Sequence, residues 1–87
     1  MKLDAIESEH IEFKETVNDS AIKTVAAFAN SDGGKIYIGV SDDGGVVGVG
    51  NVDDELLKLT DKMRANIRPD VLMMTSVDVE TFGDKKI

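Results

Sequence analysis

The side chains in this sequence that are best suited to bind a charged ligand are a group of lysines and arginines. Such cations supply most of the affinity of proteins for nucleic-acid phosphates. The candidates are Lys14, Lys23, Lys35, Lys58, Lys62, Arg64 and Arg68. Lys58 and Lys62 would lie one turn apart on a helix and form a basic stripe. Cations near the end of a helix also complement its dipole, and this alternative is sufficient for Lys62, Arg64 and Arg68.

The overall charge works against a nucleic-acid interface. The 87 residues include 10 basic and 17 acidic side chains, for a net charge of −7. Proteins that bind nucleic acids on their own usually have the opposite balance, so any binding must use a local basic patch, a bound cation or the rest of a longer protein. The chain has no cysteine and one histidine, His10. This composition excludes a thiolate zinc site and disfavours a histidine-dependent triad, and we expect His10 to be an exposed polar residue.

Two glycine-rich segments do not have the spacing of nucleotide-binding loops. The turn at residues 30–35 follows a predicted helix and precedes a predicted strand, whereas a Walker loop joins a strand to a helix. The glycines at residues 44–50 miss the dinucleotide-binding spacing. Turns and bulges account for both segments, and we expect no nucleotide cofactor.

A predicted helix and the strand after it should position most of these side chains. Ile22, Val25 and Ala29 recur with the period of a helix. Ile36 and Ile38 alternate with other residues as in a strand. The two glycines between these segments favour a tight turn that folds the helix back on the strand.

The whole pattern predicts one domain with an α+β fold and a mostly antiparallel sheet of about four strands. We expect strands at about Glu9–Lys14, Lys35–Ser41, Val46–Val49 and Val71–Glu80. Two helices, at about Ser20–Asn30 and Asp53–Ile67, should pack on one face of the sheet. The turn signal at residues 42–45 favours an antiparallel hairpin, and residues 82–85 are typical of a further turn.

Three blocks of the sequence resemble a known family. They are Glu12-Phe13-Lys14, the segment AAFANSDGG at residues 26–34 and the segment IGVSDDG at residues 38–44. In this order and spacing they resemble the Schlafen AlbA-type domain, also called the divergent AAA domain, from about Glu7 to about Pro69. The resemblance implies the N-terminal, nucleic-acid-binding domain of a transcription regulator. DNA is the expected ligand ahead of RNA, and Lys14 is the family-matched phosphate contact.

The resemblance also implies an alternative, a metal-dependent endoribonuclease. Family members with this activity use two glutamates near the Glu-Phe-Lys block and an aspartate after the Gly-Val strand. These positions correspond to Glu7, Glu12 and Asp42, and Asp43 is an equally placed alternative to Asp42. Clustered carboxylates can hold Mg²⁺ or Mn²⁺, which activates water and offsets phosphate charge. The simpler explanation is solvated carboxylates in an acidic chain, for which no cofactor is expected.

A third possibility is an oligomerisation module without a ligand of its own, and the net charge favours it. A chain of this size buries a small core, and an open sheet edge would pair with another subunit, so we expect a homodimer or higher assembly. No apolar run approaches the roughly 20 residues of a membrane helix, and the first residues do not form a signal peptide. We therefore expect a cytoplasmic protein without a membrane partner. The resemblance also implies that the chain is an N-terminal fragment of a longer regulator.

Overall fold

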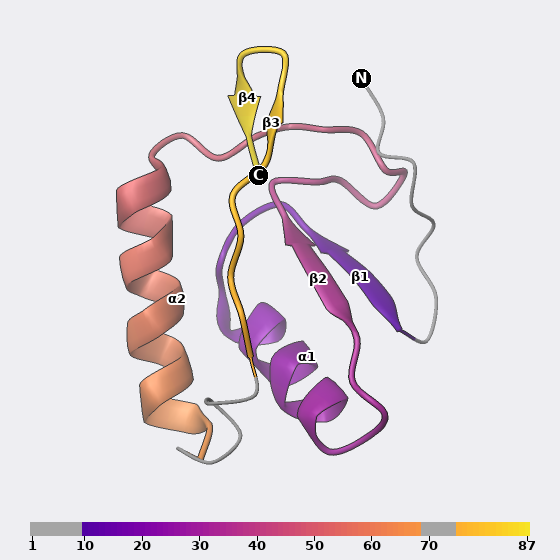
Figure 1. The fold of residues 1–87 in the computed structure, drawn as a ribbon, viewed down its shortest axis with the longest axis vertical. Coiled ribbons are helices and arrows are strands. Elements are labelled where there is room, and N and C mark those ends of the chain that lie inside the picture. The colour runs from indigo at the N-terminus through magenta and orange to yellow at the C-terminus, as the bar shows by residue number, and fades with distance from the viewer. Residues whose placement is uncertain (1–9, 69–74) are drawn as a thin grey trace.

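Two helices and four short strands make up the described part of the chain (Figure 1). The structure is a computed structural model that describes residues 10–68 and 75–87. In chain order the elements are β1 (Ile11–Lys14), α1 (Asp19–Ala29), β2 (Lys35–Ile38), α2 (Val52–Asn66), β3 (Thr81–Phe82) and β4 (Lys85–Lys86). Both helices lie within one residue of their predicted bounds.

Asparagine side chains cap the start of both helices. Asn18 Oδ1 accepts a hydrogen bond of 2.9 Å from the N–H of Ala21, and Asn51 Oδ1 accepts one of 3.1 Å from the N–H of Asp54. Each cap satisfies a backbone donor that the helix itself leaves unpaired. Three acidic residues follow in the first turn of α2, where their negative charges interact favourably with the positive end of the helix dipole. Among the described residues, neither helix is long and apolar enough to cross a bilayer.

The prediction of a mostly antiparallel sheet of four strands is wrong. The described strands form two separate pairs, with β1 parallel to β2 and β3 antiparallel to β4. The first pair runs from Ile11 opposite Lys35 to Lys14 opposite Ile38. Helix α1 connects these strands and returns the chain to the end of the sheet at which β1 began, so the two strands run in the same direction.

The predicted strand Val46–Val49 is reduced to one antiparallel bridge, between Val40 and Val46. Beyond the bridge, two consecutive N–H groups, those of Val47 and Gly48, donate to the carbonyl of Gly39 at 2.8 Å, as in a β-bulge, which interrupts the ladder locally. Gly39 and Gly48 have φ angles of +94° and +83°. Glycine adopts these angles readily, and they turn the chain away from an extended path.

The predicted strand Val71–Glu80 is not a strand in its described part. Residues 75–80 have no regular secondary structure, and residues 71–74 lie outside the described residues. The predicted turn that follows is confirmed, because Gly83 and Asp84 connect β3 to β4. Gly83 has a φ of +64°, which suits this tight connection.

The core lies mainly between the two helices and around β1. Its buried apolar residues are Phe13, Val17, Ala21, Ile22, Val40, Val46, Met63 and Ile67. Ile22 of α1 packs with Met63 of α2 and with Ile67, and Val25 and Leu59 pack against this cluster. The helical periodicity in the sequence identified Ile22 and Val25 on the side of α1 that packs against α2, where the sequence predicted packing on the sheet.

Candidate nucleic-acid interface and carboxylate site

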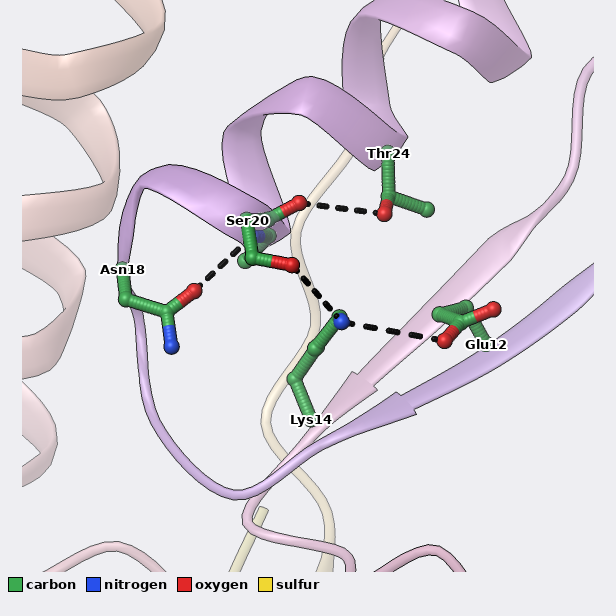
Figure 2. Close-up of polar contacts among 6 residues, drawn as sticks. Glu12, Lys14, Asn18, Ser20 and Thr24 are labelled. Atoms are coloured by element: carbon green, nitrogen blue, oxygen red, sulfur yellow. Dashed lines mark hydrogen bonds and ion pairs between the residues drawn. The ribbon is translucent and has the colours of Figure 1, made fainter.

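Lys14 lies at the end of β1, beside the first turn of α1 (Figure 2). Its Nζ donates a hydrogen bond of 2.9 Å to Ser20 Oγ and lies 3.8 Å from Oε1 of Glu12. The Lys14 side chain is only 22% exposed. A phosphate bound here would share or displace two existing polar partners, so Lys14 is a positioned cation and not a freely available one.

The two lysines of the predicted basic stripe on α2 are also paired. Lys58 Nζ lies 2.8 Å from Oε1 of Glu55, and Lys62 Nζ donates to Oδ1 of Asp19 at 2.9 Å. The second pair joins α2 to the first turn of α1. The hydrogen bond from Lys62 and the charge of Lys62 hold the pKa of Asp19 below its usual range. Both lysines therefore contribute to the structure as well as to the surface charge.

Lys35 and Arg64 are the candidate cations most available to a phosphate. Lys35 is the first residue of β2, and Arg64 lies in the last turn of α2. Both are exposed, and no polar partner holds either side chain within residues 10–68 and 75–87. Lys23 and Arg68 are exposed as well. The pKa of Asp19 is lowered first by the hydrogen bond and charge of Lys62; burial opposes this, and the charge of Lys23 lowers the pKa by less.

Parallel pairing brings the carboxyl ends of β1 and β2 to the same edge of the sheet. The carbonyl of Lys14 accepts hydrogen bonds from the N–H groups of Gly39 and Val40, at 2.7 and 3.1 Å. The end of β1 therefore adjoins the segment that leads to Asp42, which is exposed. Glu12 precedes the end of β1 by two residues and is partly exposed. An antiparallel pair would have placed these two carboxylates at opposite ends of the strands.

The two neighbouring aspartates that the sequence left as alternatives are used differently. Asp43 Oδ1 accepts hydrogen bonds from Ser41 Oγ and from the N–H of Gly45, the latter at 2.9 Å, and so helps to close the turn. Asp42 makes no hydrogen bond or ion pair within the described part of the chain. The geometry therefore favours Asp42 as the carboxylate that remains available for a ligand.

The proposed set of three carboxylates stays a prediction. Glu7 lies outside the described residues. Among residues 10–68 and 75–87, no group of three or more histidine, aspartate or glutamate side chains could hold a metal ion. Glu12 and Asp42 supply two carboxylates, and Mg²⁺ is commonly bound by one or two carboxylates with water and substrate phosphates completing the site.

His10 has a structural contact that sequence reasoning missed. Its Nδ1 lies 3.2 Å from the carbonyl of Gly33, and its own carbonyl accepts a hydrogen bond of 2.8 Å from the N–H of Lys35. The side chain is exposed, as expected. These contacts fasten the turn between α1 and β2 to the start of β1. The glycine pair in the sequence indicated the turn, but nothing in the sequence indicated what the turn packs against.

Glu55 makes a second unexpected contact. Its Oε2 accepts hydrogen bonds from the N–H of Val17, at 3.1 Å, and from Thr16 Oγ1, at 3.4 Å. The hydrogen bond from Lys58 and that from the Val17 N–H hold the pKa of Glu55 below its usual range, although burial opposes them. The first turn of α2 is thereby joined to the connection between β1 and α1.

These features define a small α+β domain built on a parallel strand–helix–strand unit, with charged residues where the strands end. The family model described as Schlafen, AlbA_2 matches residues 7–87 of the chain. The chain therefore belongs to the Schlafen AlbA_2 family, and the resemblance seen in its sequence is confirmed. Neither the curated proteins nor the solved structures gave a match to this chain.

Proposed function

We propose that this chain is a DNA-binding domain of a transcription regulator that acts in the cytoplasm. The observation that supports the proposal is its membership of the Schlafen AlbA_2 family, which is associated with nucleic acids. Lys35 and Arg64 are the first phosphate contacts in this proposal, because their charges are not already neutralised by a neighbour. Lys14, Lys58, Lys62 and Arg68 form a secondary set. Because lysine and arginine contacts release the counterions of the phosphates they neutralise, binding should weaken as salt is added.

The test is fluorescence anisotropy of a labelled DNA duplex and of the matching RNA duplex, between about 20 and about 200 mM salt. We expect tighter binding to DNA and a linear fall of log K with log salt. Lys35→Ala and Arg64→Ala should each reduce the salt slope by about 1.

Lys85→Ala is the matched control, since Lys85 is an exposed lysine outside the proposed set. Its slope should equal that of the wild type. The proposal fails if neither duplex binds at the lowest salt, or if Lys85→Ala has the same effect as Lys35→Ala. Tighter binding to RNA would contradict the preference for DNA.

The parallel pairing favours a second candidate function, the metal-dependent endoribonuclease, because it brings Glu12 toward the segment that carries Asp42. In this proposal Glu7, Glu12 and Asp42 would hold Mg²⁺ or Mn²⁺, which would supply activated water and offset phosphate charge. Cleavage of a structured RNA should then require Mn²⁺ and be lost in Glu12→Gln. Glu15→Gln, a change at an exposed glutamate just after β1, should retain it. Equal activity of the two variants would exclude this role for Glu12.

An exposed leucine favours the third candidate, self-association. Leu57 lies on α2 with 61% of its surface exposed. We propose that two copies bury it in a homodimer, since burying an aliphatic side chain between subunits removes apolar surface from water. Light scattering should give the mass of a dimer for the wild type and that of a monomer for Leu57→Lys. A monomeric wild type would rule this assembly out.

A further inference from the structure

An apolar groove lies beside β2 and opens to solvent. It has a volume of about 620 Å³ and is bounded by α1, β2, α2 and residues 75–80, but not by β1. Figure 1 shows the 75–80 segment running between α2 and β2. Phe28 of α1 and Leu56 and Leu59 of α2 are among the apolar side chains that line it. A groove of this size can hold a ligand or a segment of another chain.

The backbone edge of β2 that faces this groove is uncovered. The N–H groups of Lys35 and Gly39 donate to carbonyls on the β1 side, at 2.8 and 2.7 Å. Because successive backbone groups of a strand alternate in direction, the N–H and C=O groups of Ile36 and Ile38 point away from β1. No described strand or loop forms backbone hydrogen bonds with them from that side. Such an edge readily accepts another strand.

The hairpin of β3 and β4 ends at the mouth of the groove. Glu80 and Ile87 exchange two backbone hydrogen bonds of 3.0 Å, so antiparallel pairing continues one step beyond the two strands. Ile87 lies against the far end of β2, because a Cβ built on Gly39 would be 3.3 Å from Ile87 Cγ2. The hairpin and β2 therefore meet at one end of the groove and leave the rest of it open.

The opposite wall of the groove has the residue pattern of a strand at residues 77–80. Val77 and Val79 alternate with Asp78 and Glu80, and the two valines are 52% and 47% exposed. Residues 75–80 nevertheless have no regular structure. Alternation of apolar and polar residues is typical of a strand with one buried face. A strand in the groove would cover these valines on one side and the edge of β2 on the other.

The rim of the groove is acidic. Asp32, Asp78 and Glu80 line it and are exposed, whereas Lys35 is the only lysine or arginine that lines it within residues 10–68 and 75–87. Glu55 also lines the groove, but its carboxylate already accepts hydrogen bonds from neighbouring groups. Basic side chains on an occupant would complement this rim. A nucleic-acid backbone would instead place its phosphates against carboxylates.

We propose that this groove binds an extended peptide in which apolar residues alternate with basic residues, and that the peptide adds as a strand to the free edge of β2. Backbone hydrogen bonds to Ile36 and Ile38 provide the affinity that does not depend on peptide sequence. The apolar side chains enter the groove, and the basic ones face the acidic rim. This activity goes beyond nucleic-acid binding. The groove shares Lys35 with the proposed phosphate contacts, but Arg64 does not line it.

The test uses the 87-residue chain and a labelled peptide of alternating valine and lysine, followed by fluorescence anisotropy and amide hydrogen exchange. We expect saturable binding and slower exchange at the amides of Ile36 and Ile38. The same peptide methylated on alternate backbone nitrogens keeps its charge but cannot complete the strand, and it should bind at least about tenfold more weakly. Equal affinity of the two peptides would show attraction by charge alone and would overturn the proposal.

Two valine substitutions provide a matched pair of variants. Val77 and Val47 are 52% and 47% exposed, but Val47 does not line the groove. Val77→Lys and Val47→Lys change the net charge equally. We expect Val77→Lys to weaken peptide binding by about tenfold and Val47→Lys by less than about twofold.

Three further results would overturn the proposal. They are equal effects of the two lysine variants, absence of binding, and unchanged exchange at Ile36 and Ile38 in the presence of bound peptide. Light scattering adds a fourth. If the free chain is a dimer that excludes the peptide and dissociates on Val77→Lys, a second copy occupies the groove instead.

Discussion

The segment from β1 to β2 and the segment from residue 75 to Ile87 differ in how their backbone groups are paired. In the first, a capped helix connects two strands that pair along four residues each, and His10 fastens the intervening turn. In the second, two strands of two residues follow six residues without regular structure. Its hydrogen bonds to the rest of the chain include one of 2.9 Å from the N–H of Val49 to the carbonyl of Lys86.

This difference separates a unit that packs within itself from one that leaves apolar side chains exposed. The strand–helix–strand unit buries Phe13, Ala21 and Ile22 against its own elements and α2. Residues 75–80 expose their alternating valines instead. Stability should therefore be concentrated in the first segment, and capacity to bind should be concentrated beside the second. Substitutions in the two segments test this comparison directly.

Gly34→Val should have the largest effect. A Cβ at Gly34 would lie 2.8 Å from the carbonyl oxygen of His10 and 2.9 Å from ring atoms of Phe28. The backbone contact cannot give way cheaply, and a β-branched side chain adds two more groups, so we expect a loss of about 3 kcal/mol or more in the free energy of unfolding. That loss is a large part of the total stability of a small domain. Urea denaturation measures it.

Gly50→Val is the matched control for this prediction. No atom lies within 4 Å of a Cβ built at Gly50, so the same substitution there should cost no more than about 1 kcal/mol. An unchanged unfolding midpoint for Gly34→Val would show that the close packing of the turn against His10 is wrong.

The helices could be predicted from the sequence because their signals are local. Asn18 precedes the helical pattern of Ile22, Val25 and Ala29, and Ile22 and Val25 lie in or against the buried cluster. The sheet could not be predicted from the turn signal at residues 42–45. That turn forms. Whether the chain stays extended on either side of it depends on the positive φ angles of Gly39, before the turn, and Gly48, after it. The helix between β1 and β2 was the better guide to strand direction.

The site was less predictable, because its contacts join residues that are far apart in the sequence. Lys62 pairs with Asp19 across 43 positions, and Glu55 accepts the N–H of Val17 across 38. Charge and helical spacing correctly placed the lysine on an exposed helix, but they could not identify its partner. The family resemblance rests on three blocks of residues and did not depend on those contacts, and the family match confirmed it.

Glu55→Ala should have the next largest effect. The substitution leaves the N–H of Val17, a buried residue, without its charged acceptor and releases α2 from the connection between β1 and α1. Loss of a hydrogen bond to a charged group predicts a decrease of about 2 kcal/mol in the free energy of unfolding. Asp54→Ala is the control, since Asp54 shares the first turn of α2 but its side chain is exposed. If the two variants lose equal stability, the loss comes only from the interaction of these carboxylates with the helix dipole. The hydrogen bond from Val17 to Glu55 would then add nothing to the stability.

The same contact predicts a dependence of stability on pH. The pKa of Glu55 in the folded chain lies below its ordinary value of 4.5, because the ionised carboxylate accepts hydrogen bonds from Lys58 and Val17. Its contribution is therefore fully present above about pH 4.5 and is lost as the pH falls through the folded value. Thermal unfolding between neutral pH and about pH 3 should show a shallower decline for Glu55→Gln than for the wild type. Parallel profiles would mean that Glu55 gains nothing from its partners.

Gly83→Ala should have the smallest effect on global stability, and it tests the comparison most sharply. Gly83 has a φ of +64° between β3 and β4, and alanine in that conformation costs about 1 kcal/mol or slightly more. If the hairpin opens independently of the strand–helix–strand unit, the substitution destabilises only the hairpin. The global free energy of unfolding measured by urea denaturation should then fall by less than about 0.5 kcal/mol. Amide exchange at Glu80 and Ile87, which pair beyond the hairpin, should become faster, because their two mutual hydrogen bonds depend on the hairpin. A global loss equal to the local cost would show that both segments unfold as one cooperative unit, and the distinction between them would then fail.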